Sequence, residues 1–285
     1  MRATVVVDNR KSDALPGEWG LCIYIEYGER KLLLDTGASE LFAENAEKLG
    51  LDLSAVDAAV LSHAHYDHGN GMEAFFRRND HAPFYVGPTC AADCYAGRWF
   101  FRRYIGIPST VLSDYSRRIR YVREKTEIFP GVTLLPHSTP GLQQAGRREH
   151  MFRRVGGRWQ PDDFSHEQSL VLETEEGLVI FNSCSHAGAD NIINEVAAAF
   201  PGKTVRAMIG GFHLYNKSEA EVKTLAQKLE ATGVAYICTG HCTGPKAYEL
   251  LARTHLLNCY IYFCATSVYN SSTKGSDGCD QIRTV

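Results

Sequence analysis

A short histidine-rich segment, His63-Ala64-His65-Tyr66-Asp67-His68, constrains more than any other feature what this chain can fold into. It directly follows a short apolar run, which we expect to be a buried strand. Two histidines at positions i and i+2 of an extended chain point to the same side, so His63 and His65 can bind one metal ion. Asp67 and His68, on the turn that follows, can face a second ion. The segment therefore predicts a metal centre at the end of a strand.

Three further histidines stand in turns that contain or adjoin glycine. His186, His213 and His241 each follow an apolar run that predicts a strand. Strands of one sheet can end at a common edge, so histidines after three strands indicate a site at that edge. On spacing alone, His241 could also be an ordinary histidine of a surface loop.

The order of apolar segments indicates the architecture. Residues 21–27 and 31–35 show the pattern of a β-hairpin around a glycine-containing turn. Ser218 and Glu221 form a capping box before an amphipathic helix. Each half of the chain begins with strands and then alternates strands and helices, with no break in composition. We expect a single domain over residues 1–285, in which two sheets pack face to face with helices outside.

The region of about residues 88–165 is harder to assign to regular elements. Loops of this length are usually lids or binding insertions, so we expect an insertion that covers the site. Residues 98–104 within it read Arg-Trp-Phe-Phe-Arg-Arg-Tyr. Guanidinium groups bind phosphate or carboxylate oxygens and the rings can stack on a planar group, which predicts a small anionic substrate. The same pattern is also typical of an amphipathic helix that packs a lid against the body.

Composition excludes several classes of partner. With 30 basic and 33 acidic residues the formal charge is -3, so we expect no nucleic-acid partner. No apolar run approaches the ~20 residues that span a bilayer, so we expect no membrane segment. Nine cysteines are an odd number scattered along the chain, and the first residues do not resemble a signal peptide. Both features predict a reducing, cytoplasmic location. The oligomeric state stays open.

The histidine segment, together with Leu33-Leu34-Asp35-Thr36-Gly37 before it, resembles the metallo-β-lactamase superfamily. More narrowly, residues 163–169, 184–188, 210–214 and 241–244 resemble one of its branches. Members of that branch are labelled 7,8-dihydropterin-6-methyl-4-(β-D-ribofuranosyl)aminobenzene-5'-phosphate synthase-like proteins. The resemblance runs in order from about residue 20 to residue 262. Its motifs are specific for the fold and much less specific for the substrate.

The resemblance implies an α/β fold, a four-layer αββα sandwich of two mixed sheets flanked by helices, with the metals at one edge. It assigns the metal ligands as follows: His63, His65 and His186 to one divalent ion, and Asp67, His68 and His241 to the other. Asp35 would be a buried carboxylate that steadies the metal loop. His137 lies in a turn similar to the one that carries the usual third histidine, so it is an alternative to His186. Cys184 stands near the usual place of a bridging aspartate, and we expect it close to the metals without being an obligatory ligand.

The resemblance further implies a hydrolase with two divalent ions, zinc by default and iron or manganese as alternatives. A metal-bound hydroxide would attack an ester, phosphoester, amide or thioester. Asp67 would accept its proton, and His213 would stabilise the charged transition state. The alternatives are an iron-dependent redox enzyme on the same fold, a metal- or ligand-binding protein without activity, and a synthase. The redox reading is disfavoured because His65 stands where the diiron oxidoreductase pattern carries glutamate. The apparently complete ligand set disfavours the second alternative, and the third lacks any motif that forms a carbon–nitrogen or carbon–carbon bond.

Overall fold

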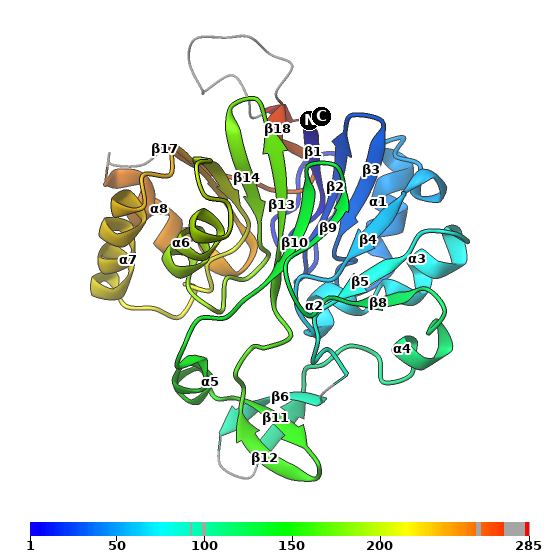
Figure 1. Cartoon of the computed structure of the whole chain (residues 1–285), viewed down its shortest axis with the longest axis horizontal. Coiled ribbons are helices and arrows are strands. Elements are labelled where there is room, and N and C mark those ends of the chain that lie inside the picture. Colours follow the sequence, from blue (N-terminus) through cyan, green and yellow to red (C-terminus); the bar gives the residue numbers. More distant parts are fainter. Residues whose placement is uncertain (92, 99–100, 255–257, 271–282, 285) are drawn as a thin grey trace.

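The computed structural model describes residues 1–91, 93–98, 101–254, 258–270 and 283–284. Trp99 and Phe100 of the arginine-rich segment, and Cys279 among the cysteines, lie outside the described residues. Two large sheets pack face to face, and helices cover the outer face of each (Figure 1). The predicted four-layer αββα sandwich is thereby confirmed.

The first sheet has the strand order β19-β18-β1-β2-β3-β4-β5-β8. Its strands are β1 (Arg2–Val7), β2 (Cys22–Tyr27), β3 (Arg30–Leu34), β4 (Ala58–Val60), β5 (Phe84–Val86), β8 (Ile119–Tyr121), β18 (Thr266–Asn270) and β19 (Arg283–Thr284). Strands β2 and β3 form the predicted antiparallel hairpin. Strands β3, β4, β5 and β8 run parallel to one another.

The second sheet has the strand order β17-β16-β15-β14-β13-β10-β9. Its strands are β9 (Thr126–Phe129), β10 (Val132–Pro136), β13 (Gln168–Thr174), β14 (Gly177–Phe181), β15 (Val205–Ile209), β16 (Tyr236–Thr239) and β17 (Asn258–Ile261). Strands β14 to β17 are parallel. In parallel strands all carboxyl ends meet at one edge, so the turns that carry the histidines of this half come together there.

Alternating side chains separate the layers. Val5 packs between the two sheets, whereas Val6 faces the outer helices of the first sheet. Helices α1 (Leu41–Lys48) and α3 (Met72–Arg78) cover that sheet, and α6 (Ala189–Ala199), α7 (Glu219–Ala231) and α8 (Pro245–Arg253) cover the second. The predicted capping box of Ser218 and Glu221 begins α7. In the described part of the chain, no helix is long and apolar enough to cross a membrane.

A third, small sheet projects from one end of the sandwich (Figure 1). It consists of β6 (Asp93–Arg98), β7 (Phe101–Tyr104), β11 (Met151–Val155) and β12 (Arg158–Pro161), and α5 (Leu142–Glu149) precedes β11. Strands β8 to β10 and the short helix α4 (Val111–Asp114) lie between its two halves in the sequence, and those strands belong to the sandwich.

The arginine-rich segment thus contributes a β-hairpin of β6 and β7, and the helical alternative is wrong. The guanidinium group of Arg102 lies 4.6 Å from the ring centre of Phe152 and 4.5 Å from that of Trp159. Arg102 therefore packs within the small sheet, where it contributes to the cohesion of the insertion.

Candidate metal centre

The loop after β4 brings the first metal position together. His63 and His65 lie on this loop, and His65 is the residue before the short helix α2 (Tyr66–Gly69). His186 comes from the turn after β14. One ring nitrogen of each of these three buried histidines lies within 4.8 Å of the other two. The structure therefore assembles the three residues expected at one ion.

Four histidine ring nitrogens in and beside this position are available as metal ligands. The Nε2 atoms of His63, His65, His186 and His241 are buried and have no hydrogen-bond partner among the described residues. An unpaired buried polar atom costs about 1–3 kcal/mol, so four together require an explanation. Burial lowers the pKa of His65 and His241 to about 3, and that of His63 and His186 well below the usual range. Neutral imidazoles with free lone pairs are the form that binds a metal ion, so this donor set fits one.

A second position lies next to the first. Oδ2 of Asp67 is 3.6 Å from Nε2 of His68 and 3.6 Å from Nε2 of His241. These separations are too long for hydrogen bonds and close to the ~3.3–3.5 Å between ligands of one ion at 2.0–2.2 Å. Asp67, His68 and His241 thus form the second predicted group.

Asp35 orients His68 and joins the two sheets. Its carboxylate accepts hydrogen bonds from the backbone N–H and hydroxyl of Ser62, from the hydroxyl of Ser183 and from Nδ1 of His68. Although burial opposes it, the carboxylates of Asp67 and Asp35 raise the pKa of His68 to about 9. The bond to Nδ1 leaves Nε2 facing the second position, as expected for Asp35.

The N-terminal strand holds His241 in the same way. Just after β1, Asp8 accepts a hydrogen bond from the backbone N–H of His241 at 2.9 Å, and Oδ1 of Asn9 lies 2.9 Å from its Nδ1. Nδ1 then carries the proton and Nε2 its lone pair. Burial raises the pKa of Asp8 to about 7.

A buried glutamate fixes the His186 turn. The carboxylate of Glu167 accepts hydrogen bonds from the backbone N–H groups of His186 and Ala187, at 2.8 and 2.9 Å. The ring of Phe164 stacks on that of His186, with centres 4.4 Å apart. These contacts set both the backbone and the ring plane of His186.

His137, the alternative to His186, has a different environment. Its Nδ1 lies 3.0 Å from Oε2 of Glu195, and its Nε2 lies 3.0 Å from Nδ2 of Asn182. Both ring nitrogens therefore have protein partners, unlike those of the histidines around the first position. This geometry favours His186 as the third histidine.

Strained backbone collects at this edge of the sandwich. Seven described non-glycine residues have positive φ angles, and Asp35, Ser185, His213 and His241 are four of them. Such conformations cost of order 1–3 kcal/mol each and persist where the surrounding structure enforces them. Each of the four stands directly after a strand or in the turn that follows one. The strained conformations therefore lie in the turns that carry the candidate site residues.

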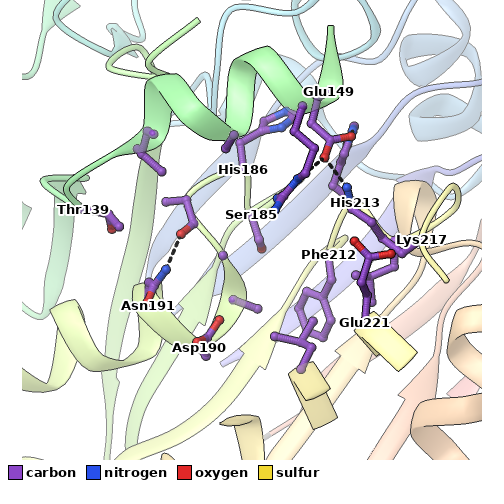
Figure 2. Close-up of a pocket in the computed structure, with 18 of the residues that line it drawn as sticks. Thr139, Glu149, Ser185, His186, Asp190, Asn191, Phe212, His213, Lys217 and Glu221 are labelled. Carbon is purple, nitrogen blue, oxygen red and sulfur yellow. Dashed lines mark hydrogen bonds and ion pairs between the residues drawn. The ribbon is translucent and has the colours of Figure 1, made fainter. Parts of the chain in front are cut away.

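A cavity of about 730 Å³ opens beside the first position. His186 and His213 line its inner wall, whereas Glu149 from the end of α5 and Lys217 from the turn before α7 line it on the other side (Figure 2). Nε2 of His213 lies 3.8 Å from a carboxylate oxygen of Glu149, which also pairs with Lys217. Arg102 and Arg98, expected above the metals, are not among the residues that line this cavity.

Several residues around the site went unnoticed in the sequence. Cys242, Glu149 and Asp8 stand outside the motif of the metal loop, and only folding brings them to it. His166 is a further example: its Nδ1 accepts a hydrogen bond from the N–H of Ala64 at 3.1 Å, and it groups with His65, Cys94 and Asp162. It ties the small sheet to the metal loop, and its place in a family-like segment was the available signal.

Comparisons with known proteins agree with this geometry. A 7,8-dihydropterin-6-methyl-4-(β-D-ribofuranosyl)-aminobenzene-5'-phosphate synthase of Methanocaldococcus jannaschii is 27% identical over 230 residues, 78% of each chain. The crystal structure of Tm1679, described as a metal-dependent hydrolase of the β-lactamase superfamily, matches with a TM-score of 0.82 and 28% identity over 95% of this chain and all of that one. Zn²⁺-bound PqqB from Methylobacterium extorquens shares the fold, with a TM-score of 0.57 and 12% identity over 93% and 98% of the two chains.

The family model described as the metallo-β-lactamase superfamily matches residues 19–241. That range contains the metal loop, the His186 turn and His241, and so covers both candidate positions. The chain belongs to the metallo-β-lactamase superfamily.

Proposed function

We propose that this protein is a hydrolase that uses two divalent metal ions on a small anionic ester or phosphoester. One observation carries the proposal: buried, unpartnered imidazole nitrogens converge from both sheets beside a cavity large enough for a small molecule. His63, His65 and His186 would hold one ion, and Asp67, His68 and His241 the other. Imidazole with carboxylate suits zinc first, and iron or manganese as alternatives.

Bound divalent ions would supply a nucleophile at neutral pH, by lowering the pKa of a water molecule from 15.7 toward ~7, and would polarise the substrate. The residues of the chain do the rest. Asp67, between the two imidazoles of its group, accepts the proton at Oδ2. His213, whose ring nitrogens have no hydrogen-bond partner among the described residues, donates to the oxygen on which charge develops.

The cavity wall supports an anionic substrate. Arg148 and Lys217 line it, and so does the beginning of α6, where Gly188 provides no side-chain cap. Uncapped backbone N–H groups and the positive end of a helix attract anions. Part of this charge is balanced, because Glu149 lies beside both cations and because Asp190 and Glu221 also line the wall. The relative from Methanocaldococcus jannaschii carries a 5'-phosphate in the name of its product, which favours a phosphate-bearing compound.

A synthase reaction is the second candidate, because that same relative is named as a synthase. Hydrolysis and the synthase reaction would both place an anionic compound beside the metal centre, so the arrangement of the site residues is compatible with either reaction. Hydrolysis ranks first because a metal-activated water needs no second organic substrate, and Tm1679 is described as a hydrolase.

The test is a turnover assay of the zinc-loaded protein on matched phosphate monoesters, carboxylate-bearing esters and neutral esters. We expect hydrolysis of at least one anionic class and loss of most of it in Asp67→Asn. A parallel assay supplies the substrates of the named synthase. Product in that assay, with no hydrolysis in the first, would replace the proposed function by the second candidate.

A further inference from the structure

Two buried sulfur atoms lie at the second metal position, where the sequence indicated at most one. Sγ of Cys184 is 3.4 Å from Nε2 of His68 and 3.3 Å from Sγ of Cys242. Cys184, His241 and Cys242 form a group in which the possible ligand atoms all lie within 4.8 Å of one another. Both thiols are almost fully buried. Cys184 also groups with His63 and His68 and with His186 and His213, so its sulfur lies between the two positions, whereas the sulfur of Cys242 lies at the second.

The backbone is shaped to accommodate the sulfur of Cys242. A Cβ atom at Gly211 would lie 2.5 Å from this sulfur, so a larger residue there would displace it. The backbone N–H of His213 donates a hydrogen bond to the same sulfur at 3.2 Å. Backbone donors of this kind tune the sulfur ligands of metal sites. The close approach of Gly211 and the hydrogen bond from His213 together fix the position of the Cys242 sulfur just after β16.

The geometry also matches that of sulfur ligands. In a tetrahedral site with metal–nitrogen bonds of ~2.0–2.1 Å and metal–sulfur bonds of ~2.3 Å, the ligand nitrogen and sulfur atoms lie roughly 3.5 Å apart. The separation of 3.4 Å between Cys184 and His68 agrees with this value. A pair of buried thiols that only hydrogen-bond to each other would account for the short sulfur–sulfur distance, but not for the convergence with Nε2 of His68 and the unpartnered Nε2 of His241.

We propose that Cys184 and Cys242 bind the second ion through sulfur, together with His68 and His241. This inference rests on the proposed function, because it requires that the site bind metal. Two imidazoles and two thiolates make a tetrahedral set typical of zinc. In this set the sulfurs replace Asp67 as a ligand of the second ion, and the carboxylate of Asp67 keeps only its role as proton acceptor. Thiolate ligands favour zinc or iron over manganese and magnesium, so they narrow the choice of metal.

Cobalt substitution tests the ligands directly, without an assay of activity. Metal-free full-length protein is titrated with Co²⁺ under reducing conditions, and the absorption spectrum is recorded at each addition. We expect a sulfur-to-cobalt charge-transfer band in the near ultraviolet beside the visible bands of bound cobalt. The band should fall by about half in Cys184→Ala and in Cys242→Ala, and vanish in the double variant, since each thiolate contributes to it separately.

Cys238→Ala is the matched control, because Cys238 is buried on the same strand that leads to His241 but lies outside the metal-binding groups given above. Its spectrum should equal that of the wild type. Visible cobalt bands without the charge-transfer band in the wild type would overturn the sulfur ligands while keeping the metal site. A charge-transfer band that survives in the double variant would assign the sulfur elsewhere and also overturn the inference. Failure of the wild type to bind cobalt or zinc at all would overturn both this inference and the proposed function.

Discussion

Oδ2 of Asp35 lies 2.7 Å from Nδ1 of His68, and both side chains are completely buried. The same carboxylate accepts from Ser62 after β4 and from Ser183 after β14, so it connects the two sheets where they meet the metal loop. A carboxylate with several donors around it fixes the ring of His68 before any ion arrives. Preorganisation of this kind determines how tightly a site binds its metal.

Asp35→Asn should weaken metal binding by about 10- to 100-fold, because one oxygen that accepts hydrogen bonds becomes an amide that donates them. Asparagine tolerates the positive φ angle at this position, so the backbone can stay as it is. Competition with a chromogenic chelator measures the affinity. Asp52→Asn, at an exposed turn, is the control and should leave the affinity unchanged. Equal affinity in the Asp35 variant and the wild type would contradict a positioning role for Asp35.

The double substitution His63→Ala, His65→Ala should remove metal and activity together. Both imidazoles point an unpartnered nitrogen into the first position, so their loss removes two donors without breaking a hydrogen bond at those atoms. We expect far-ultraviolet circular dichroism close to that of the wild type and fewer metal ions per chain by elemental analysis. The exposed His81→Ala serves as the control. If the double variant keeps its full metal content, the assignment of the metal loop is wrong.

The sequence predicted the sandwich and the histidine turns because both follow from local patterns. Alternating apolar residues set the strands, and the parallel order of β14 to β17 then brings His186 and His241 to one edge. The sequence left His137 and His186 as rivals, because His137 stands in a turn that resembles the one carrying the usual third histidine of the superfamily. Only the tertiary partners of His137, Glu195 and Asn182, show that its nitrogens are occupied.

Other parts of the site depend on contacts between distant residues. Residues 98–104 have a pattern compatible with a lid helix, but β7 pairs with β6, and β6 pairs with β11 at a sequence separation of 55 to 61 residues, so Arg98 and residues 101–104 belong to a sheet. Cys242 follows a predicted ligand directly, yet its proximity to Cys184 depends on the pairing of β14 with β15 and of β15 with β16. No local pattern contains that information.

Arg148→Ala should reduce kcat/KM for anionic substrates by roughly tenfold, the loss of one charge-assisted hydrogen bond, and change neutral substrates little. Arg148 lines the cavity with a side chain that is 65% exposed, so folding should not depend on it. Arg102→Ala should lower both kcat/KM values equally or not at all, since its guanidinium packs on Phe152 and Trp159. Matched pairs of anionic and neutral esters measure the difference. A selective loss for anionic esters in the Arg102 variant, with none in Arg148→Ala, would return the substrate-binding role to the segment 98–104.

His186→Ala and His137→Ala should separate binding of the metal from stability of the fold. His186 has an unpartnered Nε2 beside His63 and His65, so its removal should cost one metal ion per chain with little change in the melting temperature of the metal-free protein. His137 has protein partners on both nitrogens, and its removal breaks its buried contacts with Glu195 and Asn182. That should destabilise the fold by about 1–3 kcal/mol while the metal content stays at the wild-type value. Elemental analysis of both variants after loading with zinc, and thermal unfolding of their metal-free forms, decide the matter. The reverse pattern, with metal lost from the His137 variant and kept in the His186 variant, would make His137 the third histidine of the first position.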